Sequence, residues 1–204
     1  MRNIIKGLGI AVILVLGICS NTWAVSSDAD TEIMPEDLFF MQIPTVITAA
    51  KKEQKQSDTT AATFVITPED IRRSGARTIP DLLRMVPGIY VARMDANKWA
   101  ITSRGFNGRF ANKLLVMIDG RSVYTPAFSG VIWEVKDTLL EDIDRIEVVR
   151  GPGGTLWGAN AVNGVINIIT KKTIETQGSL FTTGIGTEAQ GFGGGRFGGK
   201  VGGN

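Results

Sequence analysis

Two strongly apolar segments flank a glycine-rich turn between Arg145 and Lys171, and this arrangement constrains the fold more than any other part of the sequence. Both segments are rich in β-branched residues and therefore have the composition of strands. The first contains Ile146, Val148 and Val149, and the second contains Val165, Ile166, Ile168 and Ile169. The glycines of the turn permit positive φ angles or close backbone contacts. Its proline fixes one φ angle and has no backbone N–H to donate a hydrogen bond. We therefore expect a shaped turn that packs against another part of the protein or binds something.

Residues 1–24 have the pattern of a secretory signal peptide. Two basic residues precede an uncharged apolar run, Gly7–Cys19, and Thr22–Ala24 offers a cleavage site. The run falls short of the ~20 apolar residues that a membrane-spanning helix needs, although an uncleaved anchor is the alternative. A lipoprotein signal is disfavoured because Ile18 stands where such signals place a small residue. We expect export with cleavage near Ala24.

Removal of the signal leaves a chain with balanced charge. The sequence has 22 Lys and Arg against 20 Asp and Glu, and two of the basic residues lie in the signal, so 20 of each sign remain. Nucleic-acid binding depends on an excess of basic residues that neutralise phosphates, so we expect no nucleic-acid partner. The single cysteine, Cys19, leaves with the signal, so no disulfide is expected.

Signals for catalysis or metal binding are weak. The chain has no histidine, and a mature part without cysteine argues against zinc sites and against Cys-His or Ser-His catalysis. The pair Glu141–Asp142 is typical of a solvated face, and the turn RGPGGTLWG lacks the Lys-Ser/Thr of a phosphate loop. Gly193–Gly198 fits G-x-G-x-x-G in letters only, because no apolar strand precedes it and no helix follows it. We predict no enzyme, no cofactor and no metal site.

Two short helices follow the first expected strand, Thr63–Ile66. Thr67 can cap the first helix, with Pro68 in its first position and Gly75 at its exit. The second helix repeats this pattern, with Thr78 as its cap, and it ends at Pro87 and Gly88. Further strands are expected at residues 89–92, 99–103 and 114–118, and Asp119-Gly120 predicts a hairpin turn that returns along Arg121–Tyr124.

This order of elements predicts an α+β fold with a small mixed sheet and two capped helices on one side. The sheet is expected to combine the segments that begin at Thr63, Ile89, Leu114, Arg145 and Val165. The predicted core consists of Phe64, Ile66, Leu82, Leu83, Leu115, Met117, Ile146, Val148, Val165 and Ile168.

The segment Arg145–Thr170 resembles the end of the plug domain of TonB-dependent outer-membrane receptors. The matching residues are Arg145, Ile146, Glu147, Val148, Arg150, Gly151, Pro152, Gly158, Ala161, Gly164 and Val165–Thr170. The resemblance extends upstream through SRGFNGR at Ser103–Arg109 and LLVMIDGRSVY at Leu114–Tyr124, and it covers roughly Thr45–Lys172. It implies the plug fold and a place in the bacterial outer membrane, facing the periplasm and the barrel lumen.

The resemblance also implies a domain organisation. After the signal, residues 25–55 would form a flexible periplasmic tail and residues 56–172 the plug domain. Residues 173–204, rich in glycine with partial apolar alternation, would be the first one or two strands of a barrel, cut short.

The function implied is that of a plug that gates uptake of a scarce nutrient. A ferric siderophore is the first expectation for this metal-chelate substrate, with heme or cobalamin as other substrates of the family. The alternative is a soluble periplasmic binding module, or a receptor fragment without transport activity.

The resemblance assigns three groups of candidate site residues. Thr45, Val46, Ile47, Thr48 and Ala49 look like a TonB box, an extended segment that pairs as a strand with the inner-membrane partner TonB; the alternative is that they form the first strand of the domain. The ligand-binding candidates lie in the stretches Arg104–Phe110 and Tyr124–Phe128, with Arg104, Phe106, Arg109, Tyr124 and Phe128 as the named residues. Arg121, Glu147 and Arg150 are candidates for ion pairs with the barrel wall, and the alternative is pairing within the plug.

Overall fold

The computed structural model describes residues 43–136, 138–186 and 191–199. The predicted signal peptide and the acidic part of the predicted tail lie outside the described residues. Among the described residues, no helix combines the length and apolar character needed to cross a membrane.

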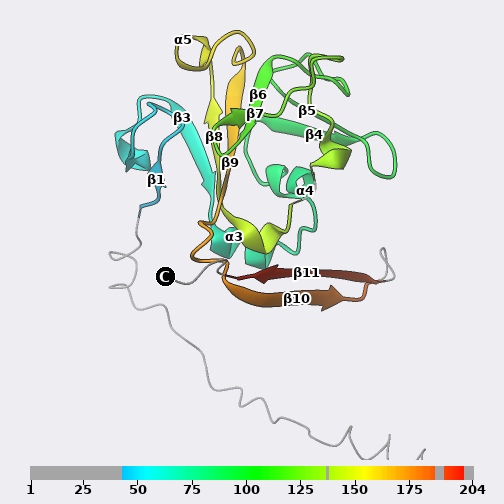
Figure 1. Cartoon of the computed structure of the whole chain (residues 1–204). Coiled ribbons are helices and arrows are strands. Elements are labelled where there is room, and N and C mark those ends of the chain that lie inside the picture. Colours follow the sequence, from blue (N-terminus) through cyan, green and yellow to red (C-terminus); the bar gives the residue numbers. More distant parts are fainter. Residues whose placement is uncertain (1–42, 137, 187–190, 200–204) are drawn as a thin grey trace, which may run out of the picture. The chain divides into compact units, whose positions relative to one another are not determined.

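A mixed five-stranded sheet forms the centre of the fold, in the order β3-β8-β9-β6-β7 (Figure 1). Its strands are β3 (Ala62–Ile66), β6 (Leu114–Ile118), β7 (Arg121–Ser122), β8 (Ile143–Arg150) and β9 (Gly164–Thr170). All neighbours are antiparallel except β6 and β9, which run parallel. The predicted α+β class with a mixed sheet is confirmed.

One segment of the predicted sheet lies elsewhere. β4 (Ile89–Arg93) pairs with β5 (Trp99–Ser103) in a separate two-stranded sheet, so the prediction that the Ile89 segment joins the central sheet was wrong. β7 already pairs with the edge of β6, because the turn at Asp119 and Gly120 reverses the chain immediately after β6. The φ angles of these two residues are 49° and 76°. Two consecutive positive φ angles are the geometry that an Asp-Gly hairpin favours.

The two helices begin where the sequence predicts. α3 (Pro68–Ser74) has Thr67 as N-cap in a full capping box and Gly75 as a left-handed C-cap with φ 65°. α4 (Ile79–Leu83) is capped by Thr78, whose hydroxyl accepts a hydrogen bond from the backbone of Asp81. α4 ends before Val86, and the chain continues through turn bonds such as that from Val86 N to Leu83 O. Proline disfavours helical backbone in the residue before it, here Val86, which explains why the α-helix gives way to single turns ahead of Pro87.

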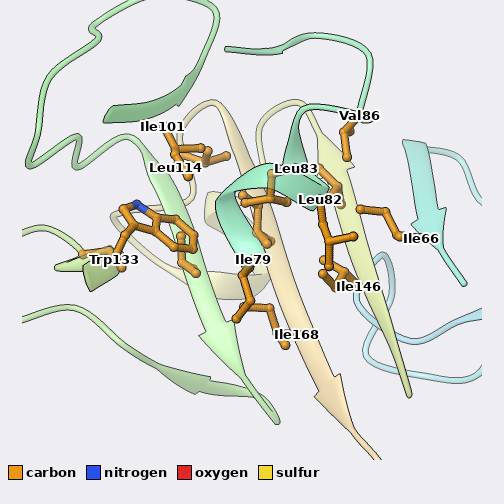
Figure 2. Packing of buried hydrophobic residues seen from close by; sticks show 14 of the residues in the cluster. Ile66, Ile79, Leu82, Leu83, Val86, Ile101, Leu114, Trp133, Ile146 and Ile168 are labelled. Carbon is orange, nitrogen blue, oxygen red and sulfur yellow. The ribbon is translucent and has the colours of Figure 1, made fainter. Parts of the chain in front are cut away.

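The face of the sheet under the helices is built mainly from apolar side chains. Strand residues Ile66, Ile146 and Ile168 meet Leu82 and Leu83 of α4, and each is at most 1% exposed (Figure 2). Nine of the ten predicted core residues are buried, and Phe64 is half-buried against the same cluster. Burial of this set supplies the main driving force for folding.

The opposite face carries a smaller apolar cluster beside polar side chains. Leu115, Met117, Val149, Ala161 and Val165 form the cluster, with Ala49, Ala61, Tyr124 and Trp157 packed against it. Glu147 and Asn167 are direct neighbours across β8 and β9, and they are 1% and 6% exposed. A buried carboxylate and a buried amide need hydrogen-bond partners, so this face requires a polar cover.

The segment before β3 is folded onto the domain. β1 (Thr45–Val46) pairs with β2 (Gln54–Lys55), and η2 (Gln56–Asp58) follows. In η2, the Gln56 side chain donates to the carbonyl of Thr63 at 3.0 Å. The described part of the expected flexible tail is therefore ordered, because its backbone and side-chain polar groups find partners in the plug.

The C-terminal described residues form a hairpin of β10 (Gly178–Gly184) and β11 (Phe192–Gly198). Arg196 of β11 pairs with Asp142 at 2.6 Å, in η4 (Leu140–Asp142). Outward residues such as Phe181 and Phe197 are 81% and 82% exposed. That residues 173–204 begin a barrel stays a prediction.

Candidate partner and ligand sites

The N-terminal segment, residues 43–50, is held on the polar face of the sheet by Glu147. One carboxylate oxygen, Oε2, accepts hydrogen bonds from the backbone N–H of Ile47 at 2.9 Å and of Thr48 at 2.7 Å. Val46 and Thr48 are each 1% exposed, whereas Ile47 is 38% exposed. The alternation places two side chains of the segment in the plug and leaves the one between them at the surface.

Two further side chains hold the same segment. The indole N–H of Trp157 donates to the carbonyl of Thr48 at 2.9 Å, and the amide of Asn167 donates to the Thr48 hydroxyl at 3.1 Å. The ammonium of Lys51 lies 4.5 Å from the centre of the Trp157 ring, a favourable cation–π contact. With the β1–β2 pairing at Thr45 and Val46, backbone groups along much of the segment are occupied.

The charge of Glu147 is balanced by Arg145. Arg145 Nε donates to Glu147 Oε1 at 2.8 Å, and its Nη1 donates to Asp144 at 2.5 Å. Burial of the guanidinium opposes its charge, but the bonds to Glu147 and then Asp144 outweigh burial and raise the pKa of Arg145. Arg145, Glu147 and the N-terminal segment therefore form one charged hydrogen-bonded network.

The predicted ligand residues before β6 lie on an exposed loop. The ligand loop, residues 104–112, carries Arg104 and Phe106 with positive φ angles of 58° and 57°. Phe106 is 76% exposed. Such backbone is uncommon for residues other than glycine, and strained exposed loops are frequent at binding sites.

Arg109 and Phe128 meet through Phe110, the last residue of the first candidate stretch. The rings of Phe110 and Phe128 stack with centroids 4.8 Å apart, and the Arg109 guanidinium lies 5.1 Å from the Phe110 ring. Arg109 also pairs with Glu134 at 2.5 Å. Burial opposes the Glu134 charge, yet hydrogen bonds from the backbone and from Arg109 prevail and lower the pKa of Glu134.

Tyr124 occupies a structural position rather than an open one. Its hydroxyl donates to the carbonyl of Leu114 at 2.6 Å, and its ring packs against both apolar clusters. Burial raises the pKa of Tyr124 to about 12. The ring is therefore a poor candidate for direct ligand contact, because its polar tip is already bound inside the plug.

The three predicted barrel contacts differ in their surroundings. Arg121 is exposed. Arg150 donates from Nη1 to the carbonyl of Pro87 at 3.0 Å, and its buried Nε has no hydrogen-bond partner among the described residues. Glu147 has its partners inside the plug, in Arg145 and the N-terminal segment, which is the alternative that the sequence left open.

Several residues of these sites were missed by sequence reasoning. They are Glu134, Trp157 and Asn167. Asn167 offered a signal, because a lone amide in the run VINII must face a polar partner if the strand is buried. Trp157 offered another, because a large ring in a glycine-rich turn needs a surface to pack on. Glu134 carried no comparable pattern.

Comparisons with known proteins agree with this architecture. The family model described as TonB-dependent Receptor Plug Domain matches residues 55–165, which is more than half of the chain. The vitamin B12 transporter BtuB of Vibrio vulnificus (strain CMCP6) is 35% identical over 147 residues, covering 71% of this chain. The aligned part is 23% of that transporter, so the chain spans about a quarter of its length.

Solved structures share the fold at lower identity. The alcaligin outer-membrane receptor FauA from Bordetella pertussis superposes with a TM-score of 0.56 and 22% identity, over 70% of this chain and 24% of the receptor. Pseudomonas aeruginosa FpvA, in a complex with iron and a heterologous pyoverdine, superposes with a TM-score of 0.51 and 25% identity, over 68% of this chain and 18% of FpvA. With the matched model over residues 55–165, the conclusion is direct: the chain belongs to the family of TonB-dependent receptor plug domains.

Proposed function

We propose that the chain is the gating plug of a TonB-dependent outer-membrane receptor that takes up a ferric siderophore. The observation that carries this proposal is the plug-family match over residues 55–165, which contains the helices, the glycine-rich turn and every strand of the central sheet except most of β9. Structures of FpvA bound to pyoverdine and of the alcaligin receptor FauA share the fold. The exposed ligand loop, with Arg104 and Phe106, offers positive charge and an aromatic surface to an anionic chelate.

Cobalamin is the second candidate substrate. It is favoured by the 35% identity to a vitamin B12 transporter. Both candidates are bulky metal chelates, and cells that produce the receptor distinguish them by uptake of iron-55 chelates or cobalt-57 cobalamin. Uptake of neither label would contradict the proposed transport function.

The partner-binding element in this proposal is Thr45–Ala49. A β-branched extended segment can add as a strand to the sheet of TonB, and its backbone groups would supply much of the affinity. In the structure these groups are engaged by β2, Glu147 and Trp157. The segment must therefore leave the plug before a partner can pair with it.

Barrel contact is assigned to Arg121 and Arg150. The exposed charge of Arg121 supports this role, and the Arg150 guanidinium has one hydrogen-bond partner among the described residues, the carbonyl of Pro87. The charge network of Glu147 is complete within the plug, so Glu147 is instead assigned to holding the N-terminal segment.

A proline substitution tests the partner-binding element. Ile47→Pro removes a backbone donor from the segment, at a residue whose side chain is 38% exposed. We expect Ile47→Pro to abolish uptake while surface binding of the chelate is retained. In a chain that also carries Thr45→Cys, we expect Ile47→Pro to abolish disulfide cross-linking to a TonB protein that bears a cysteine. Glu53→Pro, at an exposed site beyond the segment, is the matched control. Wild-type uptake by Ile47→Pro would exclude Thr45–Ala49 as the box.

A further inference from the structure

The glycine-rich turn, residues 151–163, contacts the N-terminal segment at one point. Trp157 belongs to the short helix α5 (Gly154–Trp157), and its indole is bound to the carbonyl of Thr48. The same ring lies under the ammonium of Lys51 and packs on the apolar cluster that also receives Ala49. A shift of Trp157 would therefore remove a hydrogen bond and packing from the N-terminal segment together.

The other end of the turn contacts both flanks of the ligand loop. The side-chain amide of Asn163 donates to the carbonyl of Ser103 at 2.8 Å, one residue before the loop. The backbone N–H of Asn163 donates to the carbonyl of Lys113 at 2.8 Å, one residue after it. One residue thus bridges the entry and the exit of the loop, so a change in their separation must strain at least one of these two bonds.

Between these ends the turn is compact. Gly153 N donates to Ala161 O at 2.9 Å, Trp157 N donates to Gly153 O at 2.9 Å, and Gly151 N donates to Asn163 O at 3.1 Å. Ala161 is fully buried. A Cβ added at Gly153 would lie 3.1 Å from Val165 and 3.5 Å from Ala161, so the turn is tightly packed around Gly153 and Ala161. Closely packed contacts have low compressibility and transmit strain.

We propose that the glycine-rich turn is a mechanical relay between the ligand loop and the N-terminal segment. A change in the separation of Ser103 and Lys113 displaces Asn163, and the turn transmits this displacement to Trp157. Trp157 then keeps or breaks its hydrogen bond to the carbonyl of Thr48. The relay rests on the proposed function, because it gives the loop and the segment their roles as ligand and partner sites. It adds the element that couples them and the two residues that form its ends.

Reciprocal perturbation of the two ends tests the relay, with the full 204-residue chain and neither substrate nor partner. Asn163→Ala removes the bond to Ser103 and leaves the backbone bonds of the turn. Hydrogen exchange at the Ile47 and Thr48 amides should accelerate by roughly 2- to 30-fold, the range found for residues that modulate coupling between sites. Trp157→Phe removes the bond to Thr48 and should accelerate exchange at Ala111, whose amide is held within the ligand loop by Gly108 O. Coupling free energies are reciprocal, so both effects are required.

The controls separate coupling from general destabilisation. Asn97→Ala removes an exposed asparagine that lies outside the ligand loop, the turn and the N-terminal segment, and it should change neither set of amides. Exchange at Ile146 and Ile166, in the apolar core, should stay within twofold of wild type in every variant, which shows that the fold is intact. If Asn163→Ala unfolds the chain, Asn163→Ser provides the milder perturbation at the same bond.

Purely local effects would overturn the proposal. In that result, Asn163→Ala or Asn163→Ser would accelerate exchange at Ala111 and leave Ile47 and Thr48 unchanged, and Trp157→Phe would do the reverse. Because this experiment involves no partner, its failure leaves the proline test of Thr45–Ala49 unaffected. Wild-type uptake by Ile47→Pro would in turn exclude the box and leave the measured coupling between the two ends in place.

Discussion

The two faces of the central sheet are covered in different ways. On one face, Leu82 and Leu83 of α4 close an apolar cluster in which they are fully buried. On the other face, the N-terminal segment is held by hydrogen bonds to Glu147, Trp157 and Asn167 around a smaller apolar cluster. An apolar contact is lost to water when it opens, whereas a hydrogen-bonded segment can replace its hydrogen bonds by bonds to water or to another protein. The first face therefore defines the stability of the fold, and the second provides a removable cover.

The largest effect is expected on the apolar face. Leu82→Ala removes a fully buried side chain and should lower the free energy of unfolding by about 2–5 kcal/mol, because a cavity remains. Urea denaturation followed by circular dichroism measures the loss. Leu156→Ala, in the exposed part of α5, is the control, with an expected change within about 0.5 kcal/mol. Equal losses for the two variants would mean that this cluster does not define stability.

A smaller and more local effect is expected on the polar face. Glu147→Gln keeps the size of the side chain but loses the charge that binds Arg145 and two backbone N–H groups. The loss should be about 1.5–3 kcal/mol, the range for hydrogen bonds to a charged group. It should appear mainly as faster amide exchange at Ile47 and Thr48.

Asp144→Asn is the control for that variant. Asp144 also pairs with Arg145, but its side chain is 39% exposed, so the change should cost less than about 1 kcal/mol. Unchanged protection of Ile47 and Thr48 in Glu147→Gln would show that the carboxylate does not hold the N-terminal segment.

The apolar face could be predicted from sequence because its signals are local. Alternating β-branched residues place Ile146 and Val148 on one side of a strand. Thr67 and Thr78 are N-cap signals that predict where the two helices over this side begin. The pairing of β4 could not be predicted in the same way. Its own sequence is compatible with either sheet, and the partner that it takes in the structure is β5, while β7 pairs with the edge of β6.

The polar face could be predicted only in part. Family resemblance marked Glu147 but placed its partners in the barrel, because the carboxylate and its backbone donors are 99 and 100 residues apart in sequence. No local pattern connects Trp157 with Thr48 or Asn163 with Ser103. Such contacts follow from how the strands are ordered, and the order is decided by the whole sheet rather than by any one segment.

Tyr124 lies at the border of the two faces, and its titration reports on both. Its pKa is raised to about 12 by burial, against an ordinary value of 10. Between these values the unfolded chain loses the phenolic proton while the folded chain keeps it, so the folded state binds more protons and stability falls as pH rises from 10 to 12. The ring is partly exposed, so solvent screening reduces the fall to roughly 1–2 kcal/mol.

Tyr124→Phe isolates this contribution. At pH 7 the variant should lose about 1 kcal/mol with the hydrogen bond to Leu114 O, and above pH 10 its stability curve should converge on that of the wild type. Unfolding free energies measured from about pH 9 to 12 provide the comparison. Parallel curves for the two proteins would assign the pH dependence to lysines or to Tyr90 instead.

The smallest change in stability is expected where the polar cover is converted into an apolar one. Thr48→Val with Asn167→Leu removes both members of a buried hydrogen bond, and replacement of both partners by apolar groups of similar shape is nearly neutral. Asn167 also accepts from Gly120 N at 3.2 Å, which becomes unpaired, so the net change should lie within about 1 kcal/mol. Asn167→Leu alone leaves the Thr48 hydroxyl buried without a partner and should cost more than the double variant.

The informative readout of the double variant is the N-terminal segment itself. With both polar side chains replaced by apolar ones, this contact no longer contains a hydrogen bond that another group could replace. The segment should therefore open less often, so hydrogen exchange at the Ile47 amide should slow while global stability stays constant. In receptor-producing cells, cross-linking of Thr45→Cys to TonB should fall in parallel, because a segment that does not leave the plug cannot pair with the partner. Faster exchange at Ile47 in the double variant would show that the hydrogen bonds of this face, rather than its apolar contacts, keep the segment in place.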